Sequence, residues 1–113
     1  MAIGDAPVLE ALADITAVSV ARSELDPQSL LLVRLAALIA VDAPESSYLL
    51  HVGPAAQVGV TVELVQDVLV AVAPIVGTAR TLSAAGKIVA ALDLAIELAI
   101  DAAIEAAEDD PDV

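Results

Sequence analysis

Cysteine is absent from the 113 residues of this chain. Without a thiol the protein can form neither a disulfide nor a thiolate nucleophile, and it cannot hold zinc or an iron–sulfur cluster through sulfur. Peroxidase or disulfide-reductase turnover through a cysteine is therefore excluded. The lack of disulfides fits a reducing compartment, and we predict a cytoplasmic protein.

Positive charge is scarce. Seventeen Asp and Glu residues face four Lys and Arg residues, and the formal net charge at pH 7 is −13. Such a chain repels phosphate backbones and anionic lipid, so we predict no nucleic acid and no membrane as partners. The segment Met1–Asp5 carries an acid where an export signal has basic residues. No apolar stretch reaches the roughly 18 uncharged residues of a membrane span.

Apolar residues are in excess. They make up 59% of the chain, against about 45–50% in an ordinary soluble domain with glycine included. The length suits one domain that buries roughly two-thirds of its unfolded surface. A monomer this small would leave much apolar surface in water, and association of copies is the simplest remedy. We predict one homo-oligomeric domain over residues 1–108, followed by an acidic tail over residues 109–113.

Proline, glycine and capping residues divide the chain into five predicted helices, and no alternating pattern predicts a strand. The predicted class is therefore all-α. The first helix has Pro7 in its first turn and runs to about Arg22. The second helix has Asp26 as its N-cap, followed by Pro27, and ends at Asp42–Pro44, and the third runs from Pro44 to Gly59 with a kink or split at Gly53–Pro54. The fourth helix has Thr61 as its N-cap and ends at Pro74–Gly77. The fifth helix is the longest and runs from Thr78 to about Glu108.

Apolar stripes indicate how these helices pack. The second helix is apolar almost all round, which predicts a central position. The fifth helix has a heptad-like apolar stripe suited to packing along another helix, and we predict that its own chain covers one flank and a neighbouring copy the other. The stripes are Val65, Val68, Leu69 and Val72 in the fourth helix, and Leu82, Ala85, Val89, Leu92, Ile96, Ala99 and Ala103 in the fifth.

Acidic residues also recur every four positions in the fifth helix. Like charges at this spacing lie on one face and repel, so they are tolerated where water screens them. A weak divalent-cation site is the alternative, but a hard cation needs six or more converging oxygens and one stripe cannot supply them. We therefore predict a solvated face, with no metal and no cofactor. The acidic residues are Asp93, Glu97, Asp101 and Glu105.

Ser47, Tyr48 and His51 form the candidate site. The spacing places all three side chains on one face of the third helix, and Tyr48 and His51 are the only aromatic residue and the only histidine. In one interpretation His51 is a general base beside a hydroxyl in an apolar pocket. In the other, the histidine ring is hydrogen-bonded to a backbone carbonyl or carboxylate at a helix or subunit contact, and Tyr48 fills core space.

Three segments in order carry a resemblance to a known family. Leu25–Pro27 opens an apolar helix, Pro44–Val52 contains His51, and Ala56–Glu63 follows. This order resembles the carboxymuconolactone decarboxylase and AhpD-like family of small all-helical proteins. The resemblance covers roughly residues 24–92. It implies a homo-oligomer, a trimer or a hexamer built from two trimers.

The redox branch of that family has a constellation that this chain lacks. Its Cys-x-x-Cys pair lies seven and four residues before the histidine, at positions occupied here by Pro44 and Ser47. The glutamate on its preceding helix corresponds to Leu31 or Leu32. Of the residues that form the proton relay, His51 alone is present.

The decarboxylase branch acts on a carboxylated muconolactone, and an anionic substrate needs positive charge. Arg34 and Arg80 are the candidates for substrate binding. Two hypotheses follow. The chain is a homo-oligomeric, non-catalytic or functionally diverged member of the family, or it is a cofactor-free lyase or hydrolase on a small carboxylate, with His51 as base and an arginine holding the carboxylate.

Overall fold

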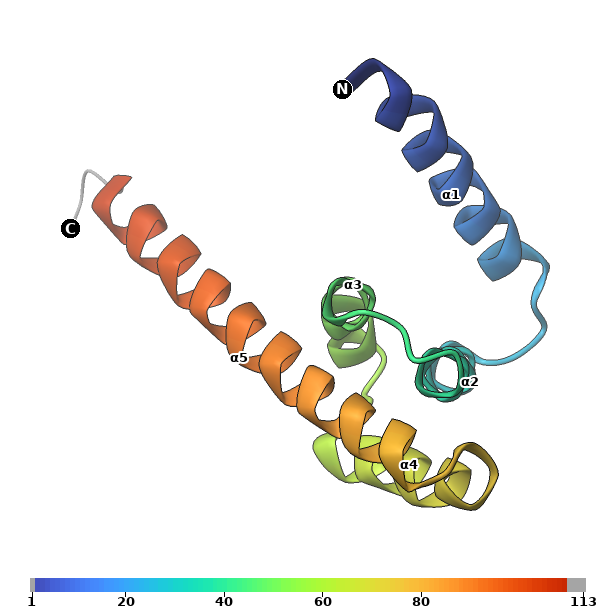
Figure 1. Ribbon diagram of the computed structural model, residues 1–113. Coiled ribbons are helices and arrows are strands. Elements are labelled where there is room, and N and C mark those ends of the chain that lie inside the picture. Colours follow the sequence, from blue (N-terminus) through green and yellow to red (C-terminus); the bar gives the residue numbers. More distant parts are fainter. Residues whose placement is uncertain (1, 110–113) are drawn as a thin grey trace.

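The computed structural model describes residues 2–109, which form five α-helices and no strand. The helices are α1 (Ala2–Arg22), α2 (Pro27–Ala40), α3 (Glu45–Gln57), α4 (Val62–Val76) and α5 (Thr78–Asp109) (Figure 1). The predicted all-α class with a long C-terminal helix is confirmed. Residues 110–113 of the predicted acidic tail lie outside the described residues.

The predicted helix caps are present. The Asp26 carboxylate accepts a hydrogen bond of 3.0 Å from the backbone N–H of the third residue of α2. The Thr61 hydroxyl accepts one of 3.2 Å at the corresponding position of α4. Gly59 and Gly77 follow α3 and α4 with φ values of 79° and 91°. That region favours glycine because a Cβ would meet the backbone there, and it ends both helices.

The prolines interrupt less than the sequence predicts. Of the kink or split predicted at Gly53–Pro54, the split is wrong, since α3 continues through Pro54 to Gln57. Pro54 lies close to the helix end and frees only the carbonyl of Leu50, whose residue is exposed, so water can satisfy that carbonyl. Pro7 and Pro74 likewise lie inside α1 and α4, near an end of each. The start of α1 therefore precedes Pro7.

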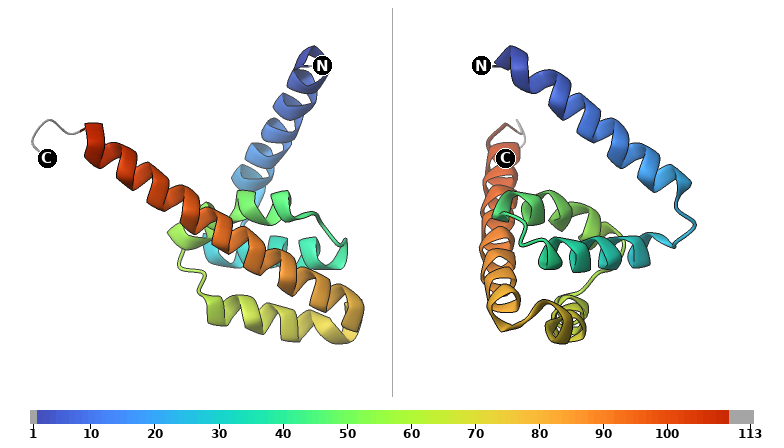
Figure 2. Two further views of the ribbon diagram at one scale, coloured as in Figure 1. Left: turned by 60° about the vertical axis from the view of Figure 1, so that its left-hand side comes forward. Right: turned by 45° about the vertical axis from the view of Figure 1, so that its right-hand side comes forward.

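Helices α2 to α5 pack into one body (Figures 1 and 2). The helix α3 packs against α5 and α2 packs against α4, and α2 contacts all three of the others, which confirms its predicted central position. The predicted stripe of α4 is half-buried against this core. Ile39 is the large side chain that the body buries completely. The buried core is Ile39, Ala43, Tyr48, Ala84, Ile88 and Ala91.

The face of α5 that the chain buries differs from the predicted stripe. Ala84, Ile88 and Ala91 point into the core, whereas Leu82 and Val89 of the predicted stripe are exposed. Both sets of residues have spacings of three and four, so the periodicity alone cannot choose between them. The buried set is rich in alanine, which allows the backbones of neighbouring helices to approach closely. Leu82, Val89 and Ile96 of the predicted stripe are thus left on the surface, whereas Leu92 is partly buried against the core.

Among residues 2–109, two segments have no helix packed closely against them. The side chains of residues 7–22 of α1 are all exposed. This helix is joined to α2 by residues 23–26 and stands away from the other helices (Figures 1 and 2). The distal half of α5, residues 94–108, extends past the body and is exposed at all but one position. In the described part of the chain, no helix combines the length and apolarity needed to cross a membrane. The exposed large apolar side chains of these two segments are Val8, Leu9, Leu12, Ile15, Val18, Val20, Leu94, Ile96, Leu98, Ile100 and Ile104.

Candidate functional site

The His51 ring is held by the backbone of its own helix. Its Nδ1 lies 2.6 Å from the Ser47 carbonyl oxygen, one helical turn earlier. A carbonyl oxygen only accepts hydrogen bonds, so Nδ1 carries the proton and Nε2 of the neutral ring keeps a free lone pair. Nε2 has no hydrogen-bond partner within residues 2–109. The imidazole is therefore oriented without a carboxylate, and it can accept a proton.

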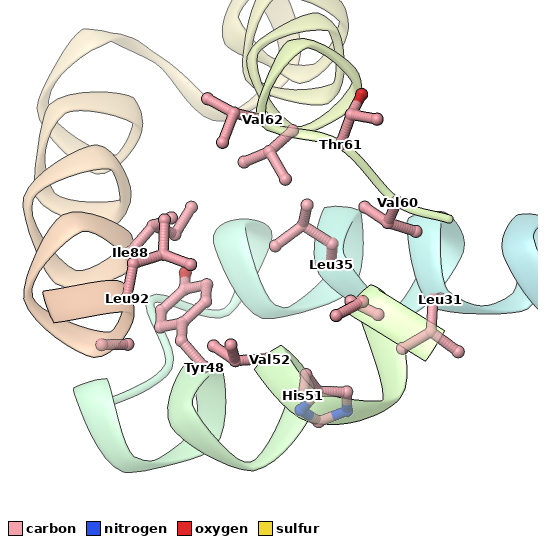
Figure 3. A pocket seen from close by; sticks show the side chains of 14 residues that line it. Leu31, Leu35, Tyr48, His51, Val52, Val60, Thr61, Val62, Ile88 and Leu92 are labelled. Carbon is pink, nitrogen blue, oxygen red and sulfur yellow. The ribbon is translucent and has the colours of Figure 1, made fainter. Parts of the chain in front are cut away.

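Tyr48 and His51 share a face of α3 but point to different neighbours. Figure 3 shows the Tyr48 ring directed toward Ile88 and Leu92 of α5, with His51 on the side of Leu31. Tyr48 is 3% exposed, and its hydroxyl has no hydrogen-bond partner in the described part of the chain. Burial, and then the negative charge of Asp42, raise the pKa of this hydroxyl. Tyr48 thus stays neutral and fills the core.

His51 borders two hollows. One is a small apolar cavity of about 130 Å³ between α2, α3, α4 and α5 (Figure 3). The other, which we call the groove, has a volume of about 940 Å³ and lies between α1 on one side and α2 and α3 on the other. Among the described residues that line them, neither hollow has an Asp or Glu, and Arg34 in the groove is the one Arg or Lys.

The structure brings together some of the predicted site residues. Arg34 lines the groove with His51, and its Nη2 donates a hydrogen bond of 3.0 Å to the Ser19 hydroxyl of α1. Arg80 lines neither hollow. Its Nη1 donates a hydrogen bond of 2.7 Å to the Ala40 carbonyl at the end of α2. Arg80 therefore caps a helix C-terminus, where a cation is favourable, away from His51.

Sequence reasoning missed a polar cluster at the end of α2. Asp42 has a φ of 54°, in the left-handed region that Asp tolerates better than most residues. Its carboxylate accepts hydrogen bonds from Lys87 at 3.0 Å and Ser83 at 3.1 Å. The spacing of Arg80, Ser83 and Lys87 places them on one face of α5. That spacing could have indicated a shared partner, but it could not have identified Asp42.

The Asp42 cluster predicts acid sensitivity. The hydrogen bond from Lys87, and then that from Ser83, lower the pKa of Asp42 in the folded chain. A lowered pKa stabilises the fold above the unfolded-state pKa of about 4, and this contribution is lost as the pH falls through the folded-state value. We expect Asp42→Asn, which keeps the left-handed backbone accessible, to lower the melting temperature slightly at pH 7.

The check is a series of thermal melts from pH 7 to pH 2.5. The difference between wild type and Asp42→Asn should shrink as the pH falls below about 4. Asp67→Asn, at an exposed position of α4, is the matched control. A difference that stays constant across this range would show that the Asp42 charge does not stabilise the fold.

The described part of the chain offers no centre for a metal. Within residues 2–109, no three side chains of His, Cys, Asp or Glu come together in a way that could hold an ion. The acidic stripe of α5 lies on the solvent-exposed side of the helix. What remains is one oriented imidazole between an apolar cavity and a groove that contains one arginine.

The fold and this site define a class: a small all-helical domain with a histidine on an inner helix. A family model described as "Carboxymuconolactone decarboxylase family" matches residues 6–91. The match spans most of the chain, and the protein belongs to this family. Comparison with curated proteins and with solved structures gave no significant match. Because the chain has no cysteine, it lacks the thiol chemistry of the redox branch.

Proposed function

We propose that the protein is a homo-oligomeric member of the carboxymuconolactone decarboxylase family that is non-catalytic or functionally diverged. The observation that carries the proposal is helix α1, which has apolar side chains exposed around it and no helix packed against it. The loss of redox activity is supported by the residues at three positions of the family's relay. Where the redox branch has its two cysteines and its acid, this chain has Pro44, Ser47 and Leu31 or Leu32.

Physical chemistry supports association of copies. Isolated helices are marginal in water, and most helical stability in proteins comes from packing of an apolar face. Six large apolar residues of α1 are each at least half exposed in the single chain. Covering such side chains stabilises by about 25 cal/mol for each Å² of apolar surface removed from water. A second copy offers surfaces of the same kind, on α5.

Light scattering on the purified protein tests this proposal. We expect a stable mass of three or six times the chain mass of 11.4 kDa, as the family resemblance implies. The measurement should be repeated over a range of micromolar concentrations to follow dissociation. A stable mass of 11.4 kDa throughout that range would overturn the proposal.

A second candidate is favoured by the contents of the groove. It holds both His51, whose Nε2 is free, and Arg34, which can bind a carboxylate. In this hypothesis the protein is a cofactor-free lyase or hydrolase on a small organic acid. Arg34 holds the carboxylate, and His51 Nε2 takes a proton from the substrate or from a water.

His51→Gln separates the two candidates. For a structural histidine, we expect the assembly to persist and the free energy of unfolding to fall by about 1–2 kcal/mol, the scale of one or two hydrogen bonds. For a catalytic base, turnover on the bound acid should fall by a factor of about 100 or more. Titration of the His51 ring by NMR, with and without a panel of small carboxylates, is the deciding measurement.

Two arginine variants make the titration specific. Under the enzyme hypothesis, a carboxylate shifts the pKa of His51, and Arg34→Gln abolishes the shift. Arg80→Gln is the matched control, since Arg80 lines neither hollow. A His51 ring whose titration ignores every ligand would leave the enzyme hypothesis without its base.

A further inference from the structure

We propose that the cavity of about 130 Å³ between α2, α3, α4 and α5 binds a small neutral apolar molecule the size of a single benzene ring. The inference goes beyond the proposed function, because it requires neither assembly of copies nor turnover. It is carried by three observations: the arrangement of the four helices, the side chains that line the cavity, and the residue types that the chain lacks.

The cavity lies at the centre of a ring of four helices. Around this ring α3 packs against α5, α5 against α4, α4 against α2 and α2 against α3. The helices α3 and α4 are not packed closely against each other, and Figure 3 shows Val62 of α4 across the cavity from Tyr48 and Val52 of α3. The interior between the helices of a bundle is a common place for a ligand site.

The amino-acid composition explains why the centre of the ring is open. Phe and Trp are absent from the chain, and Tyr48 is the one aromatic residue. Small side chains therefore form much of the lining: Val52 and Ala55 of α3, Val65 of α4 and Ala91 of α5. A core with small side chains keeps a hollow because the surrounding helices can close it only in part.

The lining selects neutral ligands. Among the described residues that line the cavity there is no Asp, Glu, Lys or Arg, so a carboxylate would lose its water without gaining a charged partner. The Tyr48 hydroxyl is itself buried, so the ring of Tyr48 and not its oxygen faces the cavity. The Thr61 hydroxyl caps α4, and His51 Nδ1 is bonded to a backbone carbonyl. A water molecule would find few of the about two to four partners that buried waters have.

The size of the cavity limits the ligand to one ring. An engineered protein cavity of about 150 Å³ with a lining of leucine, isoleucine and phenylalanine stays dry and binds benzene or xenon. The cavity of this protein is slightly smaller, at about 130 Å³, and is also apolar. Ala56, Thr61 and Val62 line it at the connection between α3 and α4, and all three are exposed. A ligand can therefore enter there while the helices stay folded.

A titration with benzene, followed by NMR of the side-chain methyl groups, tests the inference. Because the chain has one aromatic residue, the ring current of bound benzene produces shifts that stand out. We expect saturable shifts at Val52, Val65 and Ile88, which line the cavity. Val70 and Ile75 of α4 are the controls, since they are 73% and 85% exposed and lie outside it. Equal shifts in both sets, or no saturable shift at the cavity, would overturn the inference.

Variants that fill the cavity locate the binding site. Ala55→Leu adds an isopropyl group from α3, and Val65→Leu is a smaller extension from α4, at half-buried positions of the lining. We expect Ala55→Leu to weaken benzene binding at least about tenfold, and Val65→Leu to weaken it less. Ala71→Leu, at an exposed position of α4, adds the same group outside the cavity and should bind benzene as the wild type does.

Circular dichroism on each variant confirms that the helices are intact. Val65→Leu, the smaller change, carries the test if Ala55→Leu does not fold. Wild-type affinity in a folded variant of either kind would show that benzene binds elsewhere, and the inference would be wrong.

Benzoate at pH 7 separates the cavity from the carboxylate site of the second candidate function. It has the same ring as benzene with a carboxylate attached, and the described lining of the cavity offers no Arg or Lys to pair with it. We expect benzoate not to displace benzene, even if it binds beside Arg34 in the groove. Displacement would overturn the inference, since the cavity would then accept an anion. A monomer by light scattering would overturn the proposed oligomer and leave this inference intact.

Discussion

Replacing Ile39 by alanine is expected to lower the free energy of unfolding by about 2–5 kcal/mol, the range measured for large-to-small changes in well-packed cores. Ile39 has 0% exposure and lies on α2, where it packs with Tyr48 and Ile88. Truncation removes apolar contacts and leaves a cavity that the surrounding helices can fill only in part. Because the chain has few large buried side chains, little else can compensate.

Chemical denaturation of wild type and variant at one protein concentration measures this cost. The concentration is held fixed because association shifts the midpoint by mass action. Val41→Ala is the matched control: Val41 lies two residues further along the chain and is 71% exposed, so the change should be within about 0.5 kcal/mol. A loss below that value for Ile39→Ala would mean that the core of the protein lies elsewhere.

Local chemistry made most of the helix boundaries predictable. Asp26 and Thr61 accept hydrogen bonds from the first turns of α2 and α4, and Gly59 and Gly77 have the positive φ that ends a helix. Each of these features depends on residues within about one turn. The error at Pro54 has a local cause too: a proline near the end of a helix frees one carbonyl, and water can satisfy it.

Tertiary partners could not be predicted in the same way. The sequence of α5 contains two apolar stripes of equal period, and only packing against α3 and α4 selects the alanine-rich one. Arg80 was a candidate for substrate binding, yet it bonds to the Ala40 carbonyl, forty residues away in sequence. Nothing in the spacing of charges identifies such a distant acceptor.

The sequence could predict which residues form the candidate site, but not which groups these residues contact. Helical spacing places Ser47, Tyr48 and His51 on one face, but the partner of His51 is the Ser47 backbone oxygen and not its hydroxyl. Leu31, one of the two positions for the acid of the redox branch, lines both hollows beside His51. An apolar side chain there leaves the imidazole without a neighbouring carboxylate. Orientation of the ring therefore depends on the helix itself.

The stripe that the chain leaves exposed on α5 leads to the second large prediction. Ile96 is 57% exposed in the single chain, so a charge at this position should not disturb the fold. If another copy covers the stripe, the charge would be buried without a partner, which is strongly unfavourable. We expect Ile96→Glu to raise the dissociation constant of the assembly by a factor of about 100 or more, equivalent to about 3 kcal/mol.

Light scattering for the mass, with circular dichroism for helix content, separates the effects of Ile96→Glu on assembly and on folding. Val70→Glu on α4, at 73% exposure, adds the same charge and should leave the mass unchanged. Ile96 and Leu98 lie on different sides of α5, so the distal half of this helix can serve two different contacts. A hexamer built from two trimers needs two kinds of contact. A smaller but stable assembly of the Ile96→Glu variant would assign the stripe to one of them, whereas an unchanged mass would show that no copy covers it.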